Sequence, residues 1–281
     1  MLVDRGDFLC SFDMENQFFH VRLAPEHRKY FGFAVPDETG RMRFYQFKVM
    51  AYGYGPAVSV VTRLLQPVKA FLHKLGIKVS LYVDDGRISA SSKEGSEQQL
   101  EFSLQILQLC GWNIQWLKTF ILAEQQHLHL GFITDTVAMM YFYPEVKWGL
   151  FMKLLTELVE KVRRGDWCEA KEWASFLGKL QSMKRSHGDI VGVMSRSCQH
   201  ALGMAVVERG WSTRVRATGD CLSELLFMQE HLGKFHGQHL QESGPGKVYE
   251  LDRTERELQL ARDQKVGPGF WEKLAGVEEK A

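Results

Sequence analysis

Residues 80–90 read Ser-Leu-Tyr-Val-Asp-Asp-Gly-Arg-Ile-Ser-Ala, two apolar arms on either side of the tetrad Tyr82-Val83-Asp84-Asp85. Asp-Gly between apolar runs is a strong hairpin signal, because a type I′ turn needs positive φ at both central residues, and Asp and Gly tolerate it. Adjacent carboxylates are also costly, because like charges a few ångströms apart resist joint ionisation unless a proton or a cation neutralises them. The stretch therefore predicts two strands joined by a turn, with either a purely structural Asp-Gly turn or a cation site between them.

A second strand-like run lies upstream of this hairpin. Residues 7–14 read Asp-Phe-Leu-Cys-Ser-Phe-Asp-Met, and the run ends in another acidic residue, Asp13. Magnesium prefers oxygen ligands and keeps several waters, so a few carboxylates suffice to hold it. Asp13, Asp84 and Asp85 on neighbouring strands would make a two-metal site.

Composition limits the class of protein. The chain has 281 residues, of which 45% are hydrophobic and 25% charged, so it can bury one large or two small cores. Its net charge of +1 gives no overall basic field, and binding of nucleic acid would need local patches. The five cysteines show no Cys-x-x-Cys spacing, which argues against a disulfide framework or a zinc site and favours a reducing compartment.

The sequence contains no membrane or export signal. No apolar run approaches the ~20 residues that span a bilayer, and the N-terminus lacks the apolar core of a signal peptide. We therefore expect an intracellular protein of the cytoplasm or nucleus that does not contact membranes.

The first half of the chain alternates strand and helix patterns. Apolar residues recur every three or four positions in residues 55–75 and 96–109, which predicts two amphipathic helices. These helices interrupt short β-rich runs at residues 8–12, 28–35, 42–49, 78–83, 87–91 and 128–134. The order predicts an α+β fold, a split antiparallel sheet with both helices on one face.

The second half is mainly helical. Residues 145–164 form one amphipathic pattern, a second follows an N-cap at Asp166, and a third runs from Asp189 to about residue 208. Three such helices with short links predict a small bundle. After Gly210 the pattern weakens to one helix at residues 222–235 and a charged tail that we expect to be poorly ordered.

Six blocks of this sequence resemble, in order and spacing, the conserved blocks of reverse transcriptases. The similarity covers residues 8–205 and is greatest to retrotransposons of the DIRS/Ngaro type, which carry a tyrosine recombinase elsewhere. The blocks are Phe12-Asp-Met-Glu-Asn-Gln-Phe-Phe-His-Val21, Pro25-Glu-His-Arg-Lys-Tyr-Phe-Gly-Phe33, Tyr45-Gln-Phe-Lys-Val-Met-Ala-Tyr-Gly-Tyr-Gly-Pro-Ala57, Tyr82-Val-Asp-Asp-Gly86, Gly111-Trp112 with Lys118-Thr119, and Leu130-Gly-Phe132.

The resemblance implies a domain order. Residues 1–140 would be a polymerase palm with residual fingers, residues 141–210 a helical thumb-like region, and residues 211–281 a degenerate lead-in to a missing ribonuclease H domain. The implied activity is that of an RNA-directed DNA polymerase, a nucleotidyltransferase that adds deoxynucleoside triphosphates to a DNA primer on an RNA or DNA template. Two magnesium ions would be its cofactors.

The resemblance also implies residue roles. Asp13, Asp84 and Asp85 would hold the metal ions, with Asp84 favoured over Asp85 for direct coordination. Lys118 would donate a proton to the departing pyrophosphate, although a single lysine is more often a solvated charge.

Further residues would bind the substrates. Phe18 would lie beneath the incoming sugar and exclude a ribose 2′-hydroxyl, or else it is an ordinary core aromatic. The other implied contacts are Gln46, Tyr52, Gly53 and Tyr82 for template and nucleotide, Leu130, Gly131 and Phe132 for the primer end, and Lys179, Lys184, Arg185 and Arg196 for duplex phosphates.

Departures from the family pattern support a second interpretation. Only a dozen residues precede Asp13, so we expect the chain to be truncated and to lack the fingers strands whose basic residues clamp the triphosphate. Ala51 replaces a usual proline, and Glu15 and Gln17 are unusual in their block. The alternative function is therefore an inactive retroelement remnant that at most binds nucleic acid. The histidine pairs 127/129 and 236/239 lack metal spacing and are interpreted as ordinary polar residues.

Overall fold

The computed structural model describes residues 3–240, which belong to two compact units. The first unit comprises residues 1–130 and 135–138, and the second comprises residues 131–134 and those from 139 onward. Each unit has its own cluster of buried apolar side chains. In the part of the chain described, no helix is long and apolar enough to cross a membrane.

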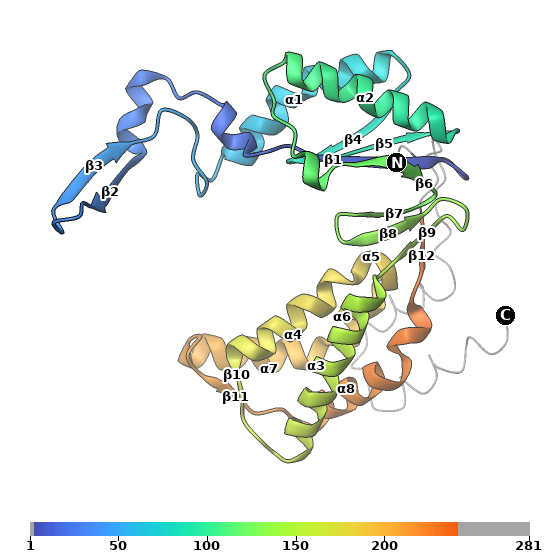
Figure 1. Cartoon of the computed structure of the whole chain (residues 1–281). Helices are drawn as coiled ribbons and strands as arrows, with labels where there is room; N and C mark the ends of the chain where they lie inside the picture. Colours follow the sequence, from blue (N-terminus) through green and yellow to red (C-terminus); the bar gives the residue numbers. More distant parts are fainter. Residues whose placement is uncertain (1–2, 241–281) are drawn as a thin grey trace. The chain divides into compact units, whose positions relative to one another are not determined.

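A four-stranded sheet organises the first unit (Figure 1). Its strand order is β4-β5-β1-β6, and β1 is antiparallel to both of its neighbours. Two helices cover one face, with α1 against β4 and α2 against β1, β5 and β6. The α+β prediction is therefore confirmed. The elements are β1 (Phe8–Asp13), α1 (Ala57–Lys74), β4 (Lys78–Tyr82), β5 (Asp85–Ala90), α2 (Lys93–Leu109), η3 (Trp116–Lys118) and β6 (Phe120–Glu124).

The two helices follow from their apolar spacing and their caps. In α1 the buried residues Val61, Leu65, Val68 and Leu72 recur every three or four positions and pack into the core. The second helix begins earlier than predicted, because the Ser92 hydroxyl accepts a hydrogen bond from the Gly95 amide and caps it.

A separate two-stranded ribbon follows the first strand. Two 3-10 turns, η1 (Gln17–His20) and η2 (Pro25–Tyr30), lead into β2 (Gly32–Pro36) and β3 (Met42–Gln46). Every residue of both strands is exposed. The predicted strand at residues 28–35 is wrong in its first half, because Pro25 fixes a φ that starts a helical turn there.

The run at residues 128–134 was predicted as one strand but contains a turn. Strand β7 (Gln126–His129) ends, Leu130 and Gly131 take positive φ values of 50° and 85°, and β8 (Phe132–Asp135) begins. Positive φ at both residues of a two-residue loop is the type I′ pattern. The prediction failed here because leucine is rare at such a position.

The second unit is a helical bundle with short strands. Its helices are α3 (Glu145–Arg163), α4 (Ala170–Ser182), α5 (Lys184–His187), α6 (Ile190–Val193), α7 (Arg196–Arg209), α8 (Gly219–His231) and η4 (Leu232–Phe235). The short strands are β9 (Met140–Phe142), β10 (Cys168–Glu169), β11 (Arg214–Val215) and β12 (Gln238–His239), paired as β10 with β11 and β9 with β12.

Three boundaries in this unit differ from the prediction. Asp166 is not an N-cap, because β10 pairs with β11 before α4 starts. The third predicted helix is broken at Ser195, whose hydroxyl bonds to the Val191 carbonyl and competes with the helical pattern. Helix α8 begins at Gly219, capped by Thr218. The predicted charged tail lies mostly in residues 241–281, outside the described residues.

A buried glutamate holds the start of α7. The carboxylate of Glu224, on α8, is 3% exposed and accepts hydrogen bonds from the Ser197 amide (2.6 Å) and the Cys198 amide (2.9 Å). These are two of the amide groups that a helix start leaves without intrahelical partners. The contact therefore joins two core helices of the second unit.

Replacing Glu224 by Gln is expected to lower the free energy of unfolding by about 2 kcal/mol, because one buried amide loses its acceptor. Urea denaturation followed by circular dichroism measures the loss. Glu230→Gln is the matched control, since this side chain on the same helix is 76% exposed and should change stability little. Equal losses in both variants would contradict the capping role.

Candidate active site

Two aspartates face each other across paired strands. Asp13, the last residue of β1, is the register partner of Asp85, the first residue of β5. Directly opposite residues of an antiparallel pair point to the same face. Asp84 lies next to them in the turn, and its carbonyl accepts a hydrogen bond from the Met14 amide at 2.9 Å. The backbone therefore places Asp13 and Asp85 at paired strand ends and Asp84 in the adjoining turn, and their role as metal ligands stays a prediction.

The turn itself differs from the predicted one. Strand β4 ends at Tyr82 and β5 starts at Asp85, so Val83 and Asp84 form the connection, and Val83 has φ 55°. Asp85 and Gly86 belong to the strand, and the Asp-Gly turn is wrong. A Cβ on Gly86 would lie 2.1 Å from Cζ of Phe12, so glycine is required by close packing of that ring.

Burial and charge crowd these carboxyl groups. Burial raises the pKa of Asp13; the nearby Lys118 lowers that pKa, and the charge of Asp84 raises it. Burial also raises the pKa of Asp85, followed by the charges of Asp84 and Asp13. The Lys118 amine lies 3.6 Å from Asp13 Oδ2 and partly offsets the repulsion. A bound cation would offset the repulsion that remains among the three carboxylates.

These residues fit magnesium by their chemistry. Carboxylate oxygens are its preferred ligands, and it takes few from a protein because it keeps waters and binds substrate phosphates. Among residues 3–240, no three His, Cys, Asp or Glu side chains form a ready metal-binding group. The donor set is therefore suitable, but its three carboxylates are not gathered as in a preformed cage.

The raised pKa values predict a pH-dependent stability. An aspartate whose folded-state pKa exceeds the unfolded value of about 3.9 contributes stability that is present below that pH and is lost as the pH rises through the folded pKa. Asp85→Asn is therefore expected to raise the melting temperature at pH 7 without divalent metal, with a gain that disappears below about pH 4. Thermal melts from pH 3.5 to 8 measure it, beside Asp4→Asn as an exposed control. A gain independent of pH would contradict this origin.

A buried glutamine supports the turn. Gln17 is 2% exposed, and in the amide orientation that satisfies both ends its oxygen accepts from the Asp84 amide (3.0 Å) while its nitrogen donates to the Val83 carbonyl (3.3 Å). Sequence reasoning missed this role. The one available signal was that Gln17 departs from the family pattern in its block.

Two of the predicted nucleotide-binding residues lie together. Phe18 is buried, and its ring meets Tyr52 edge-on with centroids 5.0 Å apart. Phe19 meets the same tyrosine at 5.3 Å. The tyrosine is 59% exposed, so this small aromatic platform has one open side. Gly53, the next residue, has φ 86°, which favours glycine there.

The other predicted contacts are dispersed. Tyr82 is the exposed cross-strand partner of Asp85, whereas Gln46 ends the exposed strand β3. Leu130 ends the first unit, and Gly131 and Phe132 belong to the second. Among the predicted phosphate contacts, all in the second unit, Lys184 pairs with Asp189 (2.6 Å), and Arg185 lies over the Tyr141 ring (4.9 Å).

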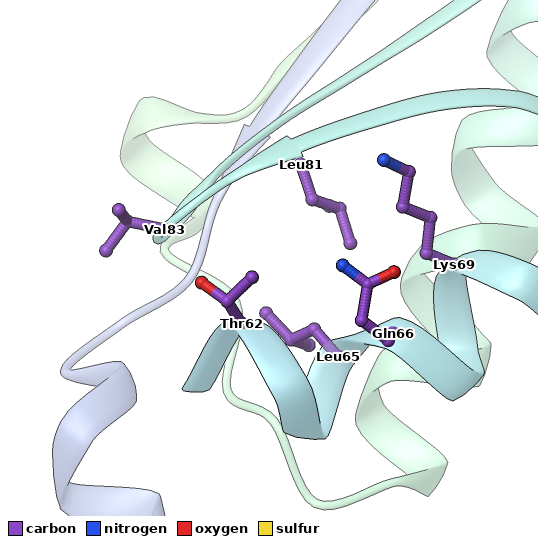
Figure 2. A pocket seen from close by; sticks show the side chains of 6 residues that line it. All are labelled: Thr62, Leu65, Gln66, Lys69, Leu81 and Val83. Atoms are coloured by element: carbon purple, nitrogen blue, oxygen red, sulfur yellow. The ribbon is translucent and has the colours of Figure 1, made fainter. Parts of the chain in front are cut away.

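A shallow pocket lies on the helix-covered face of the sheet (Figure 2). Side chains from α1 approach Leu81 and Val83 across it. Leu81 is the register partner of Gly86 and therefore faces the helices, away from Asp85. The pocket is thus separate from the carboxylate face. Its lining residues are Thr62, Leu65, Gln66, Lys69, Leu81 and Val83.

Comparison with known proteins finds sequence similarity in this chain to reverse transcriptases and retroviral polyproteins. Residues 3–134 match the family described as "Reverse transcriptase (RNA-dependent DNA polymerase)". The Gag-Pol polyproteins of Rous sarcoma virus subgroup B (strain Schmidt-Ruppin) and of avian leukosis virus subgroup A (isolate RSA) are each 26% identical over 197 residues, which cover 60% of this chain and 12% of theirs. The chain thus spans about an eighth of the length of these relatives.

Two solved structures share the fold. A foamy viral protease-reverse transcriptase in complex with RNA/DNA hybrid is 15% identical, with a TM-score of 0.62 over 85% of this chain and 29% of its own. A second, dRH form in complex with ds DNA is 15% identical, with a TM-score of 0.61 over 86% of this chain and 38% of its own. At this level of identity the structural likeness concerns the fold alone. Residues 3–134, which carry the paired strands and their aspartates, are thus the part of the chain that is similar to the reverse transcriptase family.

Proposed function

We propose that this chain is the polymerase domain of a retroelement reverse transcriptase of the DIRS/Ngaro type. It adds deoxynucleotides to the 3′-hydroxyl of a primer on an RNA or DNA template. The main support for the proposal is that Asp13 and Asp85 lie opposite each other at paired strand ends, with Asp84 beside them in the turn.

The three aspartates would hold two magnesium ions, which when bound activate the primer hydroxyl and stabilise the charge on the triphosphate. Asp84 has the greatest freedom to reach a metal, because it lies in the turn rather than in a strand. Lys118 holds its ammonium group near Asp13 and would supply a proton to the departing pyrophosphate. Phe18 and Tyr52 would support the sugar of the incoming nucleotide.

A template–primer duplex is the proposed partner. The two similar solved structures are complexes with RNA/DNA hybrid and with ds DNA, which supports nucleic-acid binding by this fold. With a net charge of only +1, this chain would rely on local basic groups such as Lys179, Lys184, Arg185 and Arg196. Deoxynucleoside triphosphates are the proposed second substrate.

Primer extension tests the proposal directly. The chain is incubated with an RNA template, a labelled DNA primer, deoxynucleotides and magnesium, and the primer is expected to lengthen only when magnesium is present. Duplex affinity is measured in parallel by fluorescence anisotropy. Duplex binding without extension would overturn the polymerase assignment and leave the nucleic-acid-binding remnant.

Replacing Phe18 by Ala is expected to increase ribonucleotide incorporation relative to deoxynucleotide incorporation by roughly tenfold, because removing a ring that blocks one hydroxyl is worth about 1.4 kcal/mol. Single-nucleotide incorporation kinetics measure the ratio. Phe19→Ala is the matched control, since Phe19 contacts the same tyrosine but is exposed. The sugar gate is excluded if both variants keep the original selectivity.

A further inference from the structure

A buried polar cluster lies on the same sheet face as the aspartates. It consists of Ser11 on β1, Arg87 on β5 and His127 on β7, exposed by only 6%, 7% and 4%. His127 Nε2 lies 2.8 Å from Ser11 Oγ, within hydrogen-bond distance. The ring of Phe120 meets the imidazole edge-on at 5.7 Å.

The strand register places this cluster directly behind the candidate metal ligands. Ser11 pairs with Arg87 just as Asp13 pairs with Asp85, two residues further along the same strands. Residues two apart on a strand point to the same face and lie about 7 Å apart along it. The polar cluster and the aspartates therefore form consecutive layers on one face.

Such a cluster is a costly way to fill an interior. Buried polar groups destabilise a fold unless they are hydrogen-bonded, and well-packed apolar side chains would serve the core at least as well. Burial, and then the charge of Arg87, lower the pKa of His127 to about 4, so the imidazole is neutral at neutral pH. A neutral imidazole can form a directed hydrogen bond to Ser11 without adding a second cation.

We infer that His127 is a positioning residue of the polymerase site: its bond to Ser11 fixes β7 against the strand that ends in Asp13. This inference rests on the proposed function. Strand β7 lies against β1 and ends at His129, and the turn that follows it begins with Leu130, a predicted primer contact. A reacting group displaced by about 1 Å can lose a hundredfold in rate, so a rigid link between β7 and the aspartate strand would set the primer end.

A double-mutant cycle tests the bond. His127→Phe and Ser11→Ala are each expected to lower the rate constant of nucleotide incorporation about tenfold per active site, because each removes the bond that fixes β7 against β1. The double variant should lose clearly less than the hundredfold product, since both polar partners are then absent. Duplex affinity should stay within about twofold in all three. Rapid-quench kinetics and anisotropy provide the readouts.

His73→Phe is the matched control. The His73 ring bonds to the Val79 carbonyl at 2.9 Å and lies on α1, the helix that covers the other face. Its loss should lower stability without changing the incorporation rate of folded protein. An equal rate loss in this control, an unchanged rate in His127→Phe, or a hundredfold loss in the double variant would overturn the inference about His127. None of these results would contradict the proposed function. If the unaltered chain extends no primer, the proposed function fails and the inference with it.

Discussion

Asp84→Asn is expected to lower the rate of primer extension about a thousandfold, equivalent to ~4 kcal/mol in activation free energy. The carboxylate would lose its charge and become a poor magnesium ligand, whereas the turn would remain. The turn is held by the Asp84 backbone, whose carbonyl accepts from the Met14 amide, and asparagine keeps that bond. Steady-state extension on an RNA template, with duplex affinity measured in parallel, provides the test.

Two further variants make the result specific. Asp4→Asn removes the same charge from an exposed carboxylate that pairs with Lys78 at 2.6 Å, and should extend primers at nearly the original rate. Asp85→Asn should lose less than Asp84→Asn, because Asp85 is fixed in a strand and crowded by two like charges. If Asp84→Asn retains the original rate, Asp84 is not a ligand of the catalytic metal and the proposed set of three aspartates is wrong.

The helices and most strands of the first unit could be predicted because their signals are local. The apolar spacing of Val61, Leu65 and Leu72 defines one face of α1 wherever that helix packs. The break at Ser195 could not be predicted, because it depends on which of two backbone patterns its hydroxyl joins. The Leu130-Gly131 turn was missed for a similar reason, since leucine adopts positive φ only when its surroundings enforce it.

The candidate site likewise contains residues that the sequence could suggest and others that only the structure shows. Asp13, Asp84 and Asp85 could be proposed from the sequence because acidic residues near strand ends form a recognisable pattern, and their role as metal ligands stays a prediction. The hydrogen bonds of Gln17 and His127 could not be predicted, because their partners lie far away in the sequence and only the folded chain brings them together. Interactions that support a site are thus less visible in one sequence than the reacting groups they support.

Gly86 shows that a local sequence motif can mislead, because Asp85-Gly86 matches a turn motif but lies in a strand. Gly86→Ala is expected to lower the free energy of unfolding by about 3 kcal/mol. The added methyl would lie 2.1 to 2.5 Å from three ring atoms of Phe12, which is itself almost fully buried. Urea denaturation of the variant measures the loss.

A second substitution separates packing from turn geometry. Gly86→Ala combined with Phe12→Leu should recover part of the lost stability, because the smaller side chain leaves room for the methyl group. Gly55→Ala is the control, since a Cβ at Gly55 would meet nothing within 4 Å. If the backbone of a turn required glycine at position 86, the size of residue 12 would not matter. A double variant that recovers no stability would therefore favour the turn explanation for Gly86. Recovery would mean that close packing against the Phe12 ring, on the strand that ends in Asp13, is what requires glycine at this position.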